Sequence, residues 1–551
     1  MAVTYMRKLE EEPKDYDKGF TKLTKGININ VQDWILSKLK KLDNVIEMGS
    51  GPGTLAKKIA NKVKKITAFD NNANMIDYAQ KNYKNNKNTN LTYQISSYKN
   101  LPVDLNSQDV IVTTFMLSEL RPLEQQIFLR NSWNILKHNG RLLIAAEFIP
   151  NGFWKLIFNI NRWRYKKKLK RLRLDETHVL KHFFNYLEPI GFKIIDKKIW
   201  KHGTIQVIEL QKTNNNSNNP GYYNPPQKNY KGIKAQFRIY RCIFTGQSDR
   251  VPIEPGVYKS GNPNKNSPII ISCNYEFTYI KLMRDLRGID AWVLCIDSNG
   301  INVWCAARGD DFGNEQLLEA LEATGIHNYI KTKKLILPQL SAGGIAIPQL
   351  PKFSEDFPFK IKYGPVWSKH LKQYLDDGKK SEEMKRAKFT LFHRVRAGFT
   401  HISFLFRKIF ILPLIGLIIL NFIFTWLNMF NKILWIVDFI IAIGLSNLLL
   451  ILIFPLSKFT RKFLIKGVFF GTINLILMGC IIWIQNYSLE YILLNLTLFF
   501  WVSFFSTMSF SGNTMSTNPR EIQSEYPIFK KINEVLMIIA IILSGISLLF
   551  Y

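Results

Sequence analysis

The feature that most constrains this sequence is the position of its long apolar runs, which lie almost entirely beyond residue 408. An α-helix needs about 20 apolar residues to cross the roughly 30 Å hydrocarbon core of a bilayer. Five runs approach or exceed that length, at about 409–430, 433–456, 467–487, 491–510 and 533–551. The sequence therefore predicts a five-span transmembrane domain over residues 408–551, preceded by soluble sequence.

The loops between these runs differ in charge. Basic residues gather in a juxtamembrane segment at 381–407 and again at 458–466 and 520–531, whereas the alternate loops have only Lys432 or no basic residue. Because basic loops stay in the cytoplasm, we expect a multi-pass protein of the cytoplasmic (inner) membrane, with its soluble domains on the cytoplasmic side. Asp438 lies near the end of the second run, so we interpret it as structural, although an intramembrane acid can also be functional.

The formal net charge is +32, an excess that suits nucleic acid, an anionic membrane face, or no specific partner. The predicted spans favour the lipid bilayer. The first 20 residues are charged and polar, so no signal peptide is expected.

The five cysteines, at 242, 273, 295, 305 and 480, form no CxxC pair. This spacing predicts a reducing compartment and argues against disulfides, and against iron–sulfur clusters or structural zinc held by this chain's cysteines alone.

Residues 1–213 alternate strand and helix patterns, with strands expected at 44–48, 65–70, 109–114 and 141–146. This alternation is typical of a parallel, doubly wound α/β sheet. Residues 214–232 are dense in Asn, Pro and Gly and predict a flexible linker. A second α/β domain follows at 233–380, with strands expected at 268–272, 291–296 and 334–337 and a helix at 314–324.

A glycine loop ends the first predicted strand. Glu47 precedes three glycines, Gly49, Gly51 and Gly53. Asp70 ends the second predicted strand. Glycines let the backbone approach a ligand closely, and the following helix offers its N-terminal N–H groups. Asp70 is placed to accept hydrogen bonds from ribose hydroxyls.

This pattern resembles the class I S-adenosyl-L-methionine-dependent methyltransferases, which have a Rossmann-like fold. A dinucleotide site would want glycine where this chain has Thr54. The resemblance implies that Glu47, the three glycines and Asp70 bind S-adenosylmethionine. Many members have an adenine-contacting Asp where this chain has Ser97, so adenine contact is expected to differ.

Residues 162–173 (RWRYKKKLKRLR) contain eight basic residues among twelve, with two aromatic residues interleaved. Such a segment can bind RNA or lie on anionic lipid; a solvated helix face is the remaining interpretation. The expected membrane domain favours lipid, and nucleic acid is not an expected partner.

A second candidate site lies at residues 302–307 (NVWCAA), after a predicted strand and a turn. Asn302 is a good N-cap and would place Cys305 at the third helical position. Backbone N–H dipoles at a helix start favour the thiolate, the form that ligates metals. The residues therefore suggest a reactive or ligating Cys305, while Cys295 in mid-strand is expected to be buried and structural.

Residues 233–551 resemble the mercury-methylation corrinoid protein family, which is related to the corrinoid iron–sulfur protein of the acetyl-CoA pathway. That family also has a five-span C-terminal membrane domain. The segments that support the resemblance are 254–258 (EPGVY), 261–268 (GNPNKNSP), 302–307 (NVWCAA), 312–313 (FG), 335–340 (LILPQL), 363–366 (YGPV) and 508–512 (MSFSG).

The resemblance implies a corrinoid (cobalamin-like) cofactor whose cobalt takes Cys305 as its lower axial ligand. The rest of the cap would be Asn302, Val303, Trp304, Ala306 and Ala307. It also implies methyl transfer to Hg(II) or another soft metal ion, with electrons from a ferredoxin-like iron–sulfur donor. The chain departs from the family after the cap, where it has residues 308–311 (RGDD), so the acceptor can differ.

These observations lead to one hypothesis and one alternative. The hypothesis is a membrane-anchored methyltransferase in which S-adenosylmethionine is the methyl source and the corrinoid is the carrier. The alternative is a membrane-tethered S-adenosylmethionine-dependent methyltransferase acting on RNA, lipid or a small molecule, with the corrinoid-like half as a scaffold.

Overall fold

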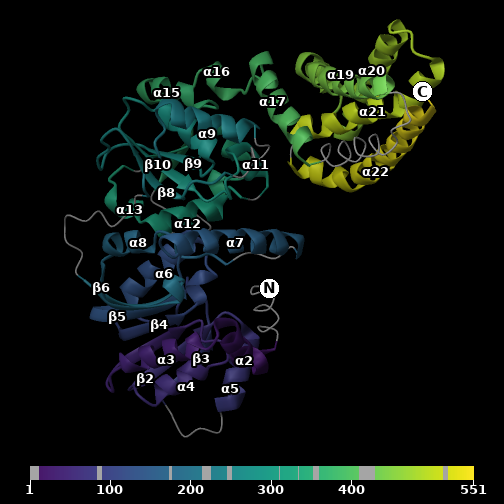
Figure 1. The fold of residues 1–551 in the computed structure, drawn as a ribbon. Coiled ribbons are helices and arrows are strands. Elements are labelled where there is room, and N and C mark those ends of the chain that lie inside the picture. The colour runs from purple at the N-terminus through teal and green to yellow at the C-terminus, as the bar shows by residue number, and fades with distance from the viewer. Residues whose placement is uncertain are drawn as a thin grey trace. The chain divides into compact units, whose positions relative to one another are not determined.

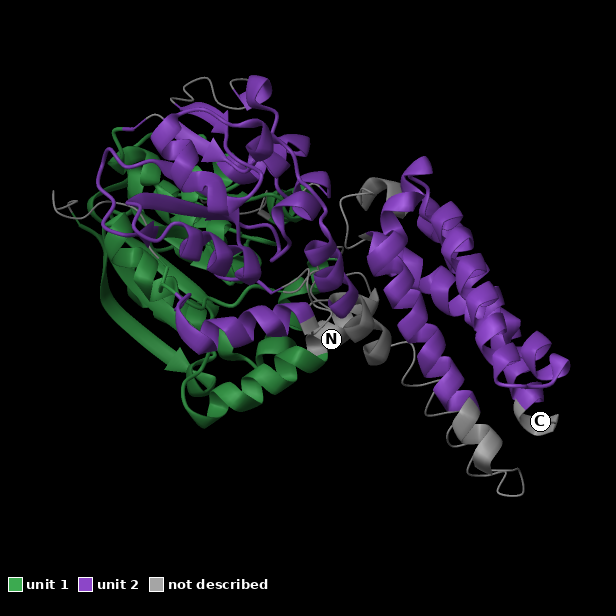
Figure 2. Cartoon of the chain, turned by 90° about the horizontal axis from the view of Figure 1, so that it is seen from above, with its two compact units in different colours: residues 1–227, 255–258, 318–331 green, residues 228–254, 259–317, 332–551 purple. Residues whose placement is uncertain are grey.

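The structure is a computed structural model that describes residues 12–83, 90–172, 177–213, 225–244, 251–309, 311–332, 334–350, 359–408, 429–512 and 519–550 (Figure 1). The chain forms two compact units. The first comprises residues 1–227, 255–258 and 318–331, and the second comprises residues 228–254, 259–317 and 332–551 (Figure 2). Residues 318–331, which the sequence placed in the second domain, thus group with the first unit.

A seven-stranded sheet forms the centre of the first unit, in the order β3-β2-β1-β4-β5-β7-β6. Strands β1 to β5 pair in parallel, as the alternating pattern predicts. β1 is almost wholly buried, and β4 and β5 each contain a continuous buried run, as expected of strands covered by helices on both faces. The strands are β1 (Asn44–Met48), β2 (Lys65–Asp70), β3 (Leu91–Ile95), β4 (Gln108–Thr114), β5 (Leu136–Glu147), β6 (Phe192–Trp200) and β7 (Ile205–Lys212).

The four strands predicted from the sequence pair in parallel, but the far edge of the sheet, which the sequence analysis did not predict, is antiparallel. β7 pairs antiparallel with both β5 and β6. Only the short 3₁₀ turn Lys201–Gly203 joins β6 to β7, and a connection of that length permits only an antiparallel hairpin.

Helices cover both faces of this sheet, as a doubly wound fold requires. Side chains of α3, α4 and α5 pack into one hydrophobic cluster, and those of α6 and α8 into the other. The helices of the unit are α2 (Pro13–Thr24), α3 (Ile27–Ser37), α4 (Thr54–Ala60), α5 (Ala73–Tyr83), α6 (Pro122–Ile135), α7 (Phe153–Leu172) and α8 (Phe183–Ile190).

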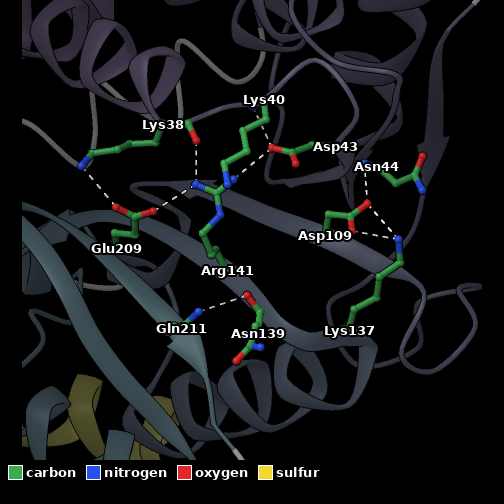
Figure 3. A network of polar contacts seen from close by, with 10 residues as sticks. All are labelled: Lys38, Lys40, Asp43, Asn44, Asp109, Lys137, Asn139, Arg141, Glu209 and Gln211. Atoms are coloured by element: carbon green, nitrogen blue, oxygen red, sulfur yellow. Dashed lines mark hydrogen bonds and ion pairs between the residues drawn. The ribbon is translucent and has the colours of Figure 1, made fainter.

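A network of ion pairs and hydrogen bonds between charged residues lies at the amino ends of β1 and β4 (Figure 3). The Arg141 guanidinium donates to the Asp43 carboxylate at 3.0 Å, to the Glu209 carboxylate at 3.1 Å and to the Lys38 carbonyl at 2.6 Å. The Arg141 side chain is 16% exposed and that of Glu209 only 6%. Nearby, Lys137 binds Asp109 at 2.8 Å in a more exposed pair.

We expect Arg141→Met to destabilise the first unit by about 3–5 kcal/mol, because it removes the guanidinium that Asp43 and Glu209 share and leaves the buried Glu209 with Lys38, at 3.2 Å. Lys137→Met, the matched control, removes a pair whose lysine is 41% exposed, and should cost less than about 1 kcal/mol. Opening free energies from hydrogen exchange of β1 and β5 amides measure both changes. Equal costs for the two variants would contradict this assignment.

The α/β part of the second unit contains a five-stranded sheet in the order β12-β11-β9-β10-β8, and its β10–β9, β9–β11 and β11–β12 pairs are parallel. β9 and β10 are completely buried. The strands are β8 (Gly256–Ser260), β9 (Ile269–Cys273), β10 (Ala291–Ile296), β11 (Lys334–Leu337) and β12 (Lys360–Tyr363). The helices are α9 (Gly232–Phe244), α10 (Glu276–Asp285), α11 (Val303–Arg308), α15 (Leu371–Asp377) and α16 (Glu382–Lys385). β8 and α12 (Asn314–Thr324) are divided between the two units, and α13 (Ile326–Tyr329) belongs to the first.

Long helices make up the rest of the second unit: α17 (Leu391–Lys408), α19 (Met429–Ile453), α20 (Phe463–Ile484), α21 (Leu489–Gly512) and α22 (Pro519–Phe550). Within the described residues, three segments are long and apolar enough to cross a membrane: Trp435–Phe459, Phe463–Ile484 and Leu489–Ser511. They correspond to the second, third and fourth predicted spans. Residues 409–428 of the first predicted span lie outside the described residues, and the fifth falls in α22, which is not among the three. The count of five stays a prediction.

Buried polar side chains join these helices to one another. Asn495 of α21 accepts from the Trp435 indole at 3.0 Å and from the Ser544 hydroxyl at 3.1 Å. Asp438 is buried and accepts from the Tyr491 hydroxyl at 3.1 Å. Hydrogen bonds of this kind hold transmembrane helices together, which is compatible with the structural interpretation of Asp438.

Candidate functional site

The glycine loop connects β1 to α4 at the carboxyl edge of the first unit's sheet. Gly49, Gly51 and Gly53 have φ angles of 71°, 52° and 81°. A Cβ at Gly49 would lie 2.8 Å from the Met116 Cβ, and a Cβ at Gly53 would collide with the Tyr93 hydroxyl. The positive φ angles and the close neighbours both require glycine here. The loop therefore presents bare backbone, as an S-adenosylmethionine site needs.

Two acids flank this loop. Asp70 accepts from the Gly51 N–H at 2.8 Å and from the Asn72 N–H at 2.9 Å, so it fixes the loop in addition to any role toward a ribose. Burial raises the pKa of Asp70, while these N–H donors oppose the rise. Glu47 is 1% exposed, and one of its carboxylate oxygens has no hydrogen-bond partner among the described residues. Burial raises the pKa of the Glu47 carboxyl well above its usual range, and the charges of Asp70 and Asp17 add to the rise.

An unpartnered buried carboxylate oxygen beside a glycine loop fits a ligand that has cationic groups. S-adenosylmethionine has two, its sulfonium and its amino group. In the ligand-free protein, burial of the Glu47 carboxylate lowers the free energy of unfolding. A bound cationic ligand offsets this loss.

We expect Glu47→Gln to stabilise the ligand-free first unit at neutral pH and to weaken S-adenosylmethionine binding by roughly tenfold or more. A carboxyl with a raised folded-state pKa stabilises the fold below its unfolded pKa of about 4.3 and loses that contribution as the pH rises through the folded pKa. The stability advantage of the glutamine variant should therefore grow with pH. Thermal midpoints across pH and equilibrium dialysis test this. The exposed Asp77→Asn is the control, and an equal pH trend there would refute the assignment.

Ser97 lies just beyond the carboxyl end of β3, a strand that the sequence analysis did not predict. The Ser96 N–H donates to the Asp70 carbonyl at 3.0 Å, so this loop lies beside the end of β2. The Ser97 hydroxyl accepts from the Lys99 N–H at 3.3 Å. The structure thus brings Glu47, the glycines, Asp70 and Ser97 to one edge of the sheet.

Sequence reasoning missed the contribution of α2 to this site. The Thr54 hydroxyl donates to the Asp17 carboxylate, and a Cβ at Gly51 would lie 3.8 Å from the Tyr16 ring. Phe20 packs edge-on against Phe115 at a centroid distance of 5.0 Å. Pro at the first position of α2 was an available signal for the helix, but nothing in the sequence places it over the glycine loop.

The cap helix α11 begins as the sequence predicted. Asn302 is its N-cap, and its side-chain oxygen accepts from the Cys305 N–H at 3.0 Å. The same side chain's amide nitrogen lies 3.4 Å from the Cys305 Sγ. Asn302 therefore contacts both the backbone and the sulfur of Cys305. Val303, Ala306 and Ala307 are buried and fix the helix against the unit.

Asn302, Val303, Trp304 and Cys305 line a cavity of about 670 Å³ within the second unit. Apolar side chains of β9 and β11 form its floor, and α10 forms one side. The charged residues that line it are Lys281, Asp285, Lys369 and Arg396. Cys305 is partly exposed, whereas Cys242, Cys273 and Cys295 are buried. The structure thus distinguishes the partly exposed thiol of Cys305 from three buried thiols, of which Cys242 also lines the cavity.

The pKa values of the core thiols support this distinction. Burial raises the pKa of Cys295 well above its usual range, raises that of Cys273, and raises that of Cys242 to about 11. These groups remain protonated at neutral pH and are poor metal ligands. Cys295 is buried in mid-strand, as expected from the sequence.

Asn274 holds the turn that precedes the cap, and sequence reasoning missed it. Its side-chain oxygen accepts from the Ser298 N–H at 3.0 Å, the Ser298 hydroxyl at 2.9 Å and the Gly300 N–H at 2.9 Å. It is 2% exposed and directly follows β9. A polar residue at the carboxyl end of a buried strand was the signal that could have identified it.

Sequence reasoning also missed one wall of the cavity. The wall lies beyond the expected domain boundary at residue 380 and consists of Phe389, just before α17, and of Phe392, His393 and Arg396 in its first turns. His393 stacks on Trp367 with ring centroids 4.8 Å apart, and the Arg396 guanidinium lies 5.1 Å from the Phe277 ring centroid. The juxtamembrane segment is therefore part of the site.

The residues after the cap take defined positions. The Arg308 guanidinium carbon lies 3.4 Å from the centroid of the Trp304 ring, and Asp311 accepts from the Asn299 side chain at 2.8 Å. Asp310 lies outside the described residues. Residues 308–311 are where the sequence departs from the expected family. There, Arg308 places its positive charge against Trp304, which lines the cavity.

Two protein families match parts of the chain. The family described as a methyltransferase domain matches residues 45–140, and that described as the CO dehydrogenase/acetyl-CoA synthase delta subunit matches residues 231–345. Among curated proteins, the acetyl-CoA decarbonylase/synthase complex subunit gamma of Methanopyrus kandleri is 33% identical over 104 residues, which are 18% of this chain and 22% of that protein. The corresponding subunit of Methanothermobacter thermautotrophicus is 28% identical over 146 residues, 26% of this chain and 31% of that protein.

The chain therefore spans between about a fifth and a third of the length of these relatives. Similar solved structures include a SAM-dependent methyltransferase from Methanosarcina mazei, which is 17% identical with a TM-score of 0.28 and covers 32% of this chain and 96% of that chain. Another, from Aquifex aeolicus, is 18% identical with a TM-score of 0.26 and covers 33% of this chain and 89% of that chain.

These findings confirm the coarse organisation predicted from the sequence. The chain contains a methyltransferase domain with a Rossmann-like fold, as its strand order and the family match agree. It also contains an α/β region related to CO dehydrogenase/acetyl-CoA synthase subunits, which fits the broad family expected for residues 233–380. In the part of the chain that the structure describes, three helical segments are long and apolar enough to cross a membrane.

Proposed function

We propose that this protein is a membrane-anchored, corrinoid-dependent methyltransferase that transfers a methyl group to a soft metal ion, with Hg(II) as acceptor and methylmercury as product. Its N-terminal domain binds S-adenosylmethionine as the methyl source. The domains face the cytoplasm, the helical part crosses the inner membrane five times, and a ferredoxin-like iron–sulfur protein supplies electrons. The observation that supports this best is the position of Cys305 in the wall of the large cavity.

The lining of the cavity suits a large, amphipathic ring compound. Most of it is apolar and aromatic, with a few polar groups at defined places, as is usual for cofactor sites. Lys281, Lys369 and Arg396 outnumber the single carboxylate, Asp285, so an anionic substituent would be accommodated. When bound, a corrinoid supplies a cobalt centre that accepts and releases a methyl group.

In this proposal two residues of the cap, Cys305 and Asn302, have distinct roles. Cys305 would hold the cobalt through its sulfur, and Asn302 contacts that sulfur through its amide nitrogen while capping the helix. Outer contacts of this kind orient a ligand and tune its basicity. Asn274 fixes the preceding turn, so the sulfur is positioned by a rigid chain of hydrogen bonds.

The first unit binds the methyl donor in this proposal. The glycines allow close approach, Asp70 accepts from ribose hydroxyls through its remaining lone pairs, and Glu47 attracts the cationic end of the donor. Ser97 lies where an adenine contact is expected. The thiolate donor of Cys305 suits release of a methyl group to a soft electrophile, and Arg308 on Trp304 influences which acceptor enters.

The test uses the full-length protein in nanodiscs under anaerobic conditions with a low-potential reductant. Hydroxocobalamin is added, unbound corrinoid is removed, and methyl-labelled S-adenosylmethionine and Hg(II) are supplied. We expect stoichiometric corrinoid retention and label in methylmercury. Failure to retain corrinoid would contradict the carrier role, and label found on RNA or lipid would assign the alternative function. Retention with no label transfer would remove S-adenosylmethionine as the source.

A further inference from the structure

The described part of the first unit contains a long helix whose outer face has no evident role in the methyl-transfer proposal. Helix α7 has 20 residues, and its apolar residues Phe153, Leu156, Ile160 and Trp163 are 69%, 58%, 49% and 58% exposed. Their spacing of three and four residues places them on one side of the helix. Soluble proteins rarely expose a continuous apolar stripe of this kind unless it contacts a partner.

The opposite side of α7 faces its own domain. Arg162 pairs with Glu147 at 3.3 Å and donates to the Thr177 carbonyl. Its guanidinium carbon lies 5.9 Å from the Phe158 ring centroid. On a helical wheel, positions 158 and 162 lie about half a turn from the apolar stripe. The stripe is therefore directed away from the unit.

Charge identifies the partner. The helix contains no acidic residue, and its second half has most of the eight basic residues of segment 162–173. An apolar stripe that includes a tryptophan, continued by a cationic run, is typical of helices that lie in the plane of an anionic bilayer. The same chain has helices long enough to span a membrane, so a bilayer is present at high effective concentration.

We propose that α7 docks the methyltransferase domain onto an anionic lipid surface, with Phe153, Leu156, Ile160 and Trp163 in the interface and with the positive charge of segment 162–173 attracting the surface. This proposal is independent of the corrinoid and of the methyl acceptor. Because Arg162 joins α7 to Glu147 at the carboxyl end of β5, lipid docking also holds this edge of the sheet near the membrane surface.

The experiment uses the full chain in nanodiscs of phosphatidylcholine alone or of phosphatidylcholine with phosphatidylglycerol. Hydrogen exchange of residues 153–163 should be about tenfold slower in the anionic discs, because lipid contact removes open states of the helix. Replacing Phe153, Leu156 and Ile160 with Gln, a good helix former, should abolish the difference. Gln at the exposed Leu42 and Leu105 is the matched control and should leave it unchanged.

Charge is tested separately. Single Lys-to-Gln variants should each weaken the preference of α7 for anionic over neutral discs by about fivefold. The variants are Lys166→Gln, Lys167→Gln, Lys168→Gln and Lys170→Gln. Equal protection in both kinds of disc would overturn the proposal. Protection by added RNA, with none from anionic lipid, would overturn it as well and would assign α7 to nucleic acid.

Discussion

Cys305→Ala is expected to remove the sulfur-to-cobalt signature from the visible spectrum of the corrinoid-loaded protein and to lower methyl transfer to Hg(II) on the order of 100-fold or more. Loss of an outer contact to a metal ligand already costs 10–100-fold, and here the ligand itself is lost. Corrinoid retention should fall less, because the apolar walls of the cavity remain. Absorption spectra and methylmercury formation measure the two effects separately.

Two further variants sharpen this result. Cys480→Ala removes the exposed thiol of α20 and should leave both the spectrum and the rate unchanged. Asn302→Asp keeps an oxygen to cap α11 but replaces the amide that lies 3.4 Å from the sulfur. It should preserve the helix and slow alkylation of Cys305 by roughly tenfold, because a hydrogen bond to a charged group is lost. An unchanged spectrum in Cys305→Ala would exclude the thiol as ligand.

Gly53→Ala is the second change with a large expected effect. Gly53 has a φ of +81°, and a Cβ there would collide with the Tyr93 hydroxyl, which donates to the Gly53 carbonyl at 3.1 Å. The left-handed backbone and the overpacking together should cost about 2–5 kcal/mol. S-adenosylmethionine affinity should fall by more than about tenfold, since the loop cannot keep its shape.

Gly152→Ala is the matched control for Gly53→Ala. Gly152 has a φ of +61° but no atom within 4 Å of its built Cβ, so it should pay only the backbone cost of about 1–2 kcal/mol. Thermal unfolding followed with and without S-adenosylmethionine distinguishes the two. If both variants lose equal stability and neither loses affinity, the close packing around Gly53 has no role in the donor site.

Local patterns in the sequence predicted much of this architecture. The strands at β1, β2, β9, β10 and β11 lie where short apolar runs placed them, and Asn302 caps α11 as its residue type and position indicated. Such features depend on neighbours in the chain, so the sequence displays them directly. The roles of the site residues stay predictions, as do the acceptor, the electron donor and the five spans.

The parts that the sequence did not reveal depend on long-range contacts. Nothing near Asn274 indicates that its oxygen would receive three donors from a turn more than 20 residues away. Likewise, α2 packs over a loop about 30 residues later, and β7 inserts between β5 and β6 by a hairpin. Periodicity reports which face of an element is apolar, but not which partner covers it.

The aromatic and basic wall at the start of α17 has a practical consequence for anyone who shortens this chain. A soluble fragment that stops at residue 380 retains Cys305 and its cap but lacks Phe389, Phe392, His393 and Arg396, which close one side of the cavity. Cofactor uptake by such a fragment would report on an open cleft. A fragment intended to preserve the enclosed site must extend through Ala397, and thus into the segment that leads to the membrane.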